Sequence, residues 1–93
     1  MASEAGFMEV SEIKALIENG IDGVEASVKG DGSHYEAVVI GECFDGQSMV
    51  AQQKMVYATL NEHITSGAIH AITIKTYTPA QWQKASQFQI KAE

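Results

Sequence analysis

Residues 69–82 read Ile-His-Ala-Ile-Thr-Ile-Lys-Thr-Tyr-Thr-Pro-Ala-Gln-Trp, and this stretch decides how the rest of the chain is organised. Its first half is rich in β-branched residues and alternates apolar with polar side chains, which predicts a half-buried β-strand with Ile72 and Ile74 on the buried face. His70 stands at the entrance of this strand. Alternation places its imidazole on the same face as the two isoleucines, at the rim of an apolar surface, where a neutral ring nitrogen can meet a metal or a partner.

The second half of the stretch predicts the start of a helix. Thr78 has the side chain of an N-cap, Pro79 suits the first helical position, and Gln81 stands three residues after the threonine, as in a capping box. Tyr77 and Trp82 flank this start. We expect these two aromatic residues to close the helix onto the sheet as part of the core.

The rest of the chain divides into helical and strand-like patterns bounded by turns. Apolar residues recur at helical spacing over residues 9–19 and 49–65. Residues 24–29 and 35–44 have strand-like patterns, and the turn residues 30–33 between them predict a hairpin. The stripe of the long helix that we expect in the core consists of Met49, Val56, Leu60 and Ile64.

This order of helix, strand, strand, helix, strand, helix indicates an α+β fold of the broad α/β type. The short turn makes the first two strands antiparallel neighbours, and the long helix allows a right-handed crossover to a parallel third strand. We therefore expect one three-stranded mixed sheet covered by helices. Residues 9–84 would form this single domain, with flexible tails at residues 1–8 and 85–93.

The composition argues against several classes of function. The chain has 93 residues and a formal charge of -6, which repels phosphate backbones and anionic membranes. Its lysines are scattered, and there is no arginine for bidentate phosphate or base contacts. No apolar run approaches the ~20 residues needed to span a bilayer, and the start lacks a signal-peptide pattern. The single cysteine, Cys43, cannot form an internal disulfide, so we expect a cytoplasmic protein.

The sequence lacks the motifs of common enzyme classes. It has no nucleophile elbow, no phosphate-cradling Gly-Lys-Ser or Gly-Lys-Thr loop and no zinc-ligand spacing. Ser33 and His34 are adjacent, but neighbours in an extended strand point to opposite faces and cannot act as nucleophile and base. We therefore expect no catalytic activity.

Five short motifs, in order, resemble those of BolA-like proteins along nearly all of residues 9–83. They are Asp31-Gly32-Ser33-His34-Tyr35, Phe44-Asp45-Gly46, Met55-Val56-Tyr57 with Leu60, Ile69-His70-Ala71 and Tyr77-Thr78-Pro79-Ala80-Gln81-Trp82. The sequence looks most like the short bacterial BolA-like branch. The resemblance implies a fold similar to the class II KH domain, which agrees with the predicted order of helices and strands.

The resemblance also implies a function. BolA-like proteins pair with monothiol glutaredoxins of the Cys-Gly-Phe-Ser type and share a bridging [2Fe-2S] cluster, with roles in iron-sulfur trafficking, iron homeostasis and the stress response. The other ligands come from the glutaredoxin cysteine and glutathione, so we expect no tightly bound cofactor on the isolated chain. The family's ligand histidine falls on His70. Imidazole in place of thiolate removes negative charge from the cluster and raises its potential.

The second ligand implied by the resemblance has no clear match. In the family it is a Cys or His in the loop between the first two strands, and that loop here is only residues 30–33. His34 is the nearest histidine and the candidate second iron ligand. Asp31 is an oxygen alternative with weaker affinity for such a cluster.

Each of these side chains also has a purely structural interpretation. His70 could hold a backbone carbonyl at the rim of the sheet, and His34 could serve the mouth of the hairpin. We expect His63, near the end of the long helix, to favour the negative end of the helix dipole. Cys43 lies at the far end of the second strand from His34, so we expect a plain thiol there rather than a cluster ligand.

The alternative function is that of a KH-like nucleic-acid-binding transcriptional regulator. A KH module clamps nucleotides with a Gly-x-x-Gly loop and usually has positive charge beside it. This chain has neither in the right place. Near the start of its long helix it has Ala51-Gln52-Gln53-Lys54, which contains a single cation. Binding to nucleic acid would therefore rely on a partner or on glutamine contacts.

A protein partner is expected to dock where both chains can reach the same irons. That surface comprises His70, residues 30–35 and the start of the long helix, with Lys54 and Lys75 favouring an anionic partner. Alone, the chain is expected to be a monomer or, through an exposed sheet edge, a weak homodimer.

Overall fold

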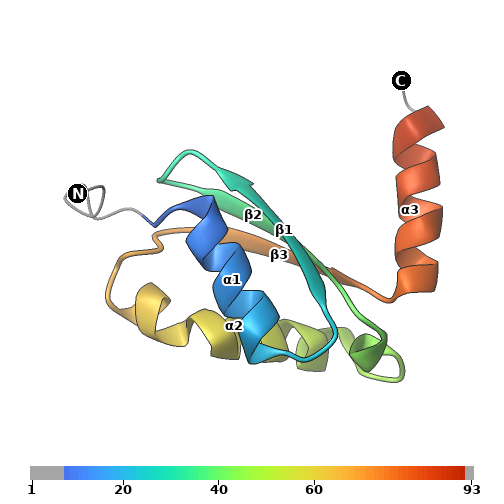
Figure 1. Cartoon of the computed structure of the whole chain (residues 1–93), viewed down its shortest axis with the longest axis horizontal. Helices are drawn as coiled ribbons and strands as arrows, with labels where there is room; N and C mark the ends of the chain where they lie inside the picture. Colours follow the sequence, from blue (N-terminus) through green and yellow to red (C-terminus); the bar gives the residue numbers. More distant parts are fainter. Residues whose placement is uncertain (1–7, 92–93) are drawn as a thin grey trace.

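The computed structural model describes residues 8–91, which are arranged around one three-stranded sheet (Figure 1). The helices and strands are α1 Val10–Gly20, β1 Glu25–Gly30, β2 Tyr35–Ile40, the 3-10 helix η2 Glu42–Phe44, α2 Met49–Thr65, β3 Ile72–Tyr77 and α3 Pro79–Lys91. The predicted order is confirmed, with the short η2 added after the second strand. Residues 1–7 and 92–93, the outer parts of the two expected tails, lie outside the described residues.

The strands lie in the order β1-β2-β3, so β2 is central. β1 pairs with β2 in antiparallel fashion, with Lys29 opposite Glu36, and β2 pairs with β3 in parallel, with Tyr35 opposite Ile72. The predicted mixed sheet is confirmed. The tight hairpin gives the antiparallel pair, and α2 carries the chain back along the sheet to begin the parallel strand.

The core lies between one face of the sheet and helices α1 and α2, which both lie on that face (Figure 1). Removing these apolar side chains from water is the main force that holds the helices to the sheet. The buried core residues are Ile13, Ile17, Ile21, Ala26, Tyr35, Ala37, Val39, Phe44, Val56, Leu60, Ile69 and Ile74.

Of the four α2 residues expected in the core, the first, Met49, does not belong to it. Val56 and Leu60 are fully buried, but Met49 is 61% exposed, and the buried residue of the first turns is Gln52. The polar side chain is tolerated there because its amide is completely used: Nε2 donates to the carbonyls of Phe44 and Gln47, at 3.2 and 2.9 Å. A buried amide with its hydrogen bonds made carries little desolvation cost.

The opposite face of the sheet is covered by neither α1 nor α2. Tyr77 and Trp82 meet on this side, with ring centroids 5.3 Å apart and ring planes at 57°. This contact joins α3 to the sheet, as expected, but both rings are half-buried and lie outside the core, so the expectation that they belong to the core is wrong. Strand alternation explains this, because Tyr77 points away from the face that carries Ile74.

The two ends of the domain are longer than the sequence pattern suggested. Met8 packs against the core, and its carbonyl accepts a hydrogen bond of 2.6 Å from the buried Tyr35 hydroxyl. At the other end α3 continues to Lys91, where a tail was expected from residue 85, and it stands beyond the end of β3, apart from α1 and α2 (Figure 1). Within residues 8–91, none of the helices combines the length and apolar character that crossing a bilayer requires.

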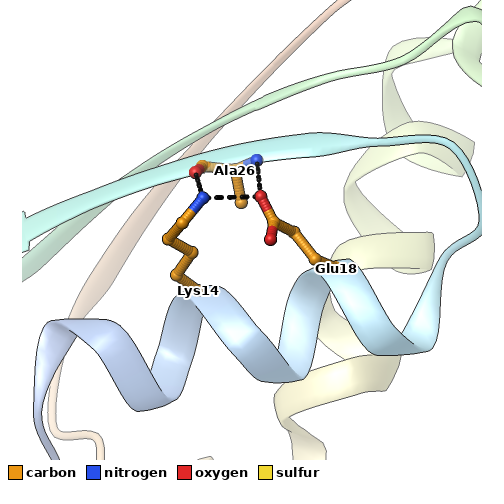
Figure 2. A network of polar contacts seen from close by, with 3 residues as sticks. All are labelled: Lys14, Glu18 and Ala26. Atoms are coloured by element: carbon orange, nitrogen blue, oxygen red, sulfur yellow. Dashed lines mark hydrogen bonds and ion pairs between the residues drawn. The ribbon is translucent and has the colours of Figure 1, made fainter.

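Both edge strands are tied to a helix by side chains. Figure 2 shows Lys14 and Glu18 of α1 reaching Ala26 of β1. Glu18 accepts from the Ala26 N–H at 2.9 Å, while Lys14 donates to the Ala26 carbonyl at 2.9 Å and to Glu18 at 2.6 Å. On the other edge, Gln53 of α2 donates to the carbonyl of Ile74 in β3 at 2.7 Å. These bonds occupy strand groups that would otherwise be open to another chain.

Candidate functional site

The turn between β1 and β2 is built around the side chain of Asp31. Its Oδ1 accepts hydrogen bonds from the backbone N–H of Ser33 and of His34, each at 3.1 Å, and from the Ser33 hydroxyl at 3.0 Å. The Ser33 and His34 N–H groups, with the hydroxyl, hold the pKa of Asp31 below its ordinary value of 3.8. Asp31 was the oxygen alternative to His34 as second ligand. In the structure, its Oδ1 accepts the hydrogen bonds that form the turn.

A close approach of the backbone closes the same turn. A Cβ on Gly30 would lie 2.5 Å from the His34 carbonyl oxygen and 2.9 Å from the Cα of Tyr35, so no larger residue fits without a shift. The Asp31 N–H donates to the His34 carbonyl at 3.3 Å. Gly30 thus allows the close approach that fixes the position of the His34 backbone at the end of the turn.

His34 is exposed and lies on the face of the sheet that α1 and α2 leave uncovered. Its Nε2 lies 3.3 Å from Oγ1 of Thr73 on β3, a hydrogen-bond distance. Together with Lys29 and Glu36 it lines a shallow open depression beside the turn. The imidazole is therefore accessible from outside the protein.

His70 is exposed two residues before β3 begins at Ile72. Its neighbour Ile69 is only 1% exposed, and the Ile69 N–H donates to the carbonyl of His63 at 3.0 Å. The predicted position at the strand entrance is confirmed. The predicted alternation does not extend to His70, however, because the strand starts later and Ile69 fills the core instead.

The strand register brings His34 and His70 to the same end of the sheet. Tyr35 is opposite Ile72, and the Tyr35 N–H donates to the carbonyl of Ala71 at 2.9 Å. His34 precedes Tyr35, and His70 precedes Ala71, at the starts of parallel strands whose backbones are ~4.8 Å apart. Two residues 36 positions apart in sequence thus lie at the same end of the sheet.

His63 also lies at this end of the sheet. For both His63 and Cys43, the structure agrees with the structural roles predicted from the sequence. His63 is the one basic residue in the last turn of α2, as expected for a side chain that favours the helix dipole. Cys43 is exposed in η2, after the end of β2 that lies opposite His34. The predicted separation of the thiol from the hairpin turn is confirmed.

The described residues offer at most part of a ligand set for a metal centre. Within the described residues, no three or more His, Cys, Asp or Glu side chains are grouped so that they could hold a metal ion. A [2Fe-2S] cluster takes four ligands. Two exposed histidines at one end of the sheet can supply part of such a set, and a second molecule has to supply the rest.

Lys75 was expected to favour an anionic partner, but in the structure its charge is already paired. Glu36 on the central strand pairs with Lys75 at 3.1 Å and with Lys29 at 3.6 Å. The hydrogen bond and charge of Lys75, followed by the charge of Lys29, hold the pKa of Glu36 below 4.5, and Glu36 in turn raises the pKa of Lys75. Lys75 is therefore already engaged with a carboxylate, whereas Lys54 is exposed on α2.

The expectation that the start of α2 belongs to the docking surface with His70 and residues 30–35 is wrong. Gln52 and Gln53 bond to Thr76 and Ile74 near the end of β3, so the start of α2 lies at the opposite end of the sheet from the two histidines.

Helix α2 also presents apolar groups that its polar sequence did not suggest. The large exposed hydrophobic side chains of the described residues are Met49, Val50 and Tyr57, all on this helix. Gln52, which is buried, and Gln53, which is half-buried, instead donate to backbone carbonyls. The helical spacing of Val50 and Tyr57, seven residues apart, was the available signal, since it marks one side of a helix.

The fold and this site together define a small α+β domain with a hairpin, a crossover helix and a histidine at the entrance of the last strand. The chain belongs to the BolA-like protein family, whose sequence model matches residues 10–81. The resemblance seen in the sequence is thereby confirmed.

Individual relatives support the same assignment. The chain is 46% identical over 77 residues to the acid stress protein IbaG of Escherichia coli strain K12, an alignment that covers 83% of this chain and 92% of IbaG. Its structure is similar to that of a BolA protein homologue from Coxiella burnetii, with a TM-score of 0.74, 38% identity and coverage of 83% and 99% of the two chains. The BolA domain of SufE1 from Arabidopsis thaliana gives a TM-score of 0.65 at 27% identity, over 75% of this chain and 91% of that domain.

Proposed function

We propose that this chain is a non-enzymatic adaptor that binds a monothiol glutaredoxin and shares a bridging [2Fe-2S] cluster with it, in iron-sulfur trafficking and iron-linked regulation. His70 is the principal iron ligand from this chain, and His34 is the second. The glutaredoxin cysteine and glutathione supply the remaining ligands. The site of action is a reducing compartment, the cytoplasm, in keeping with a single exposed cysteine.

One observation supports the proposal most: the parallel register of β2 and β3 brings the backbones of two exposed histidines, His34 and His70, to the same end of the sheet. Neither ring is buried, so a second protein can approach both. The chain alone offers no complete ligand set in its described part. A cluster that needs ligands from two chains would form only when the partner is present, which suits a carrier that passes the cluster on.

The chemistry of histidine supports this role. When bound, the cluster supplies an iron-sulfur centre whose histidine ligands leave it less negatively charged than four thiolates would. The protein's part is to supply two imidazole side chains and a docking surface. Tyr57, halfway along α2, offers exposed apolar area, and aromatic residues are enriched at protein interfaces. Val50 lies at the other end of the sheet and is not part of the proposed docking surface.

Membership in a family that includes an acid stress protein supports a link to the stress response. In this proposal, the link runs through the partner and its cluster rather than through a reaction catalysed by this chain. The nucleic-acid alternative gains no support from the glutamines at the start of α2, because Gln52 and Gln53 are bonded internally.

Anaerobic reconstitution tests the proposal. The chain is mixed with a monothiol glutaredoxin, iron, sulfide and glutathione, and the products are separated by size exclusion and examined by visible circular dichroism. We expect a coloured complex of one chain with one glutaredoxin. Replacement His70→Ala should alter its spectrum strongly, and His34→Ala should alter it less.

Cys43→Ala is the matched control, because it removes the one thiol of the chain from the opposite end of β2. We expect it to leave the spectrum unchanged. If no complex forms, the adaptor function is wrong, and binding of single-stranded nucleic acid at low salt becomes the next experiment. A complex with the same spectrum in wild type and His70→Ala would remove His70 from the ligand set.

A further inference from the structure

His34 is held by its backbone and by its ring. Its N–H donates to Oδ1 of Asp31 at 3.1 Å, and its carbonyl accepts from the Asp31 N–H at 3.3 Å. Its ring Nε2 lies 3.3 Å from Oγ1 of Thr73, 39 positions later in the sequence. The imidazole of an exposed residue is thereby fixed against a neighbouring strand.

The contact with Thr73 follows from the register of the parallel strands. Glu36 lies opposite Thr73, and His34 is two residues before Glu36, so all three share the face of the sheet that α1 and α2 leave open. The ring of His34 therefore reaches along the strands to the hydroxyl. In the part of the chain that the structure describes, this ring is the one hydrogen-bond partner of the Thr73 hydroxyl.

A hydrogen bond to one ring nitrogen decides which nitrogen stays free. Neutral imidazole carries one N–H and one lone pair. If Nε2–H donates to Oγ1 of Thr73, the lone pair is on Nδ1 and is open to a metal. If the hydroxyl donates to Nε2 instead, the lone pair is consumed and Nδ1 carries the proton. Metal-ligating histidines almost always donate their second N–H to an oxygen, which fixes the tautomer and the ring orientation.

We propose that Thr73 is a positioning residue that fixes the Nε2–H tautomer of His34 and so presents Nδ1 as the ligating nitrogen. The identity of the ligand rests on the proposed function, but the tautomer is a property of the isolated chain. This assigns a role to a strand residue that the sequence pattern marked only as polar. It also explains how a loop too short to carry a ligand of its own can deliver one from the first residue after it.

Nitrogen NMR of the isolated chain tests the tautomer directly. Two-bond proton-nitrogen correlation spectra distinguish Nδ1–H from Nε2–H rings at a pH where histidine is neutral. We expect His34 to be predominantly the Nε2–H form. Thr73→Val keeps the branched shape of the side chain and removes the hydroxyl, so the His34 signals should shift. Thr73→Ser should restore the wild-type pattern.

His63 and His70 provide internal references in the same spectra, because the variants should leave their ring signals in place. Ser27→Ala is the matched control, since it removes an exposed hydroxyl from the same open face of the sheet. A wild-type His34 in the Nδ1–H form would overturn the proposal. So would His34 signals that are the same in Thr73→Val as in the wild type.

The second measurement uses the reconstituted complex with glutaredoxin, iron, sulfide and glutathione. Loss of the cluster to an iron chelator should be about 10-fold faster for Thr73→Val than for the wild type, the size typical of losing an outer partner of a ligand. Thr73→Val should add nothing to His34→Ala, because its effect runs through that ring. An additional effect in the His34→Ala background would contradict the positioning role.

These results separate the two proposals. If no complex forms while the NMR shows the expected tautomer and its dependence on Thr73, the adaptor function fails and Thr73 still orients His34. If the complex forms and depends on His70 but on neither His34 nor Thr73, the adaptor function stands and the inference about Thr73 fails.

Discussion

The side-chain oxygen of Gln52 accepts a hydrogen bond of 2.6 Å from the hydroxyl of Thr76, joining helix α2 to edge strand β3 inside the protein. Both residues are buried, with 6% and 5% of their surface exposed. With the two carbonyls that its amide nitrogen reaches, Gln52 forms a small polar centre in an otherwise apolar core. Such a centre stabilises the fold only while every member has its partner.

Gln52→Leu should therefore destabilise the protein even though it adds an apolar residue to the core. The change removes the oxygen acceptor of the buried Thr76 hydroxyl and the side-chain donor to the carbonyls of Phe44 and Gln47, although the Phe44 carbonyl keeps the Gln47 N–H. We expect a loss of about 2 kcal/mol in the free energy of unfolding, measured with urea. Gln47→Leu is the control, because that side chain is exposed, and it should change the stability by less than about 0.5 kcal/mol. Equal effects of the two changes would show that the buried hydrogen bonds contribute little.

The pKa of Glu18 should respond only in part to removal of Lys14. The Ala26 N–H is the larger cause that holds this pKa below its ordinary value of 4.5, and the Lys14 ammonium is the second. We expect Lys14→Met to raise the pKa and yet leave it below 4.5, as followed by carboxyl carbon NMR during an acid titration. A return to the ordinary value would mean that Lys14 is the dominant cause.

The Glu36 ion pairs should make stability depend on pH in a defined window. The folded-state pKa of Glu36 lies below 4.5, so its ionisation stabilises the fold above that value, and the stabilisation is lost as the pH falls through the folded pKa. The pKa of Lys75 lies above 10.5, so its contribution is complete below that value and is lost as the pH rises through the folded pKa.

Glu36→Gln should thus lower the free energy of unfolding most at neutral pH and converge with the wild type in acid. Because the groups are partly exposed, we expect a small difference, measured by urea unfolding at a series of pH values. Glu25→Gln, on the same face of the sheet, is the control and should leave the free energy of unfolding close to that of the wild type, because Glu25 takes no part in these ion pairs. A difference from wild type that stays constant into acid would exclude the ion pairs as its cause.

Gly30→Ala should destabilise the hairpin that carries His34. The new Cβ would meet backbone atoms of His34 and Tyr35 that cannot move independently, and such overpacking costs about 1–3 kcal/mol. Gly46→Ala is the comparison, because Gly46 has a φ of 79° but no atom within 4 Å of a Cβ, so it reports backbone strain alone. In thermal unfolding, Gly30→Ala should lower the melting temperature at least as much as Gly46→Ala does.

Binding to nucleic acid should be weak and should disappear as salt is added. Lys75 is paired with Glu36, and both glutamines at the start of α2 are bonded internally, which leaves few groups for a phosphate backbone. We expect fluorescence anisotropy with single-stranded DNA to give a Kd above about 1 μM at physiological salt, the range of non-specific binding. Tighter, salt-resistant binding would favour the transcription-regulator alternative.

The local parts of the fold could be predicted because their causes lie close together in sequence. The capping box at the start of α3 is present as expected: the Thr78 N–H donates to Gln81 at 2.9 Å, and the Gln81 N–H donates to the Thr78 hydroxyl at 3.2 Å. The hairpin and the parallel third strand also followed from turn residues and connection length. The position of His70 at the strand entrance depended on the same local pattern.

The features that escaped prediction depend on groups far apart in sequence. Gln52 is buried because of two carbonyls on the preceding loop and a hydroxyl on β3, none of which its own helix reveals. The contact between His34 and Thr73 depends on the register of two parallel strands, which composition and periodicity do not specify. The sequence therefore predicted His34 and His70 as candidate ligands, but it could not predict the contact between the His34 ring and Thr73.

The bonds at the two edges of the sheet have a consequence for how the protein opens. β1 is tied to α1 through Ala26, and β3 is tied to α2 through Ile74. An edge strand that frays alone also has to break the side-chain bonds to the helix beside it, which adds to the free energy that fraying costs. We therefore expect each edge to open as a strand-helix pair rather than as a strand alone.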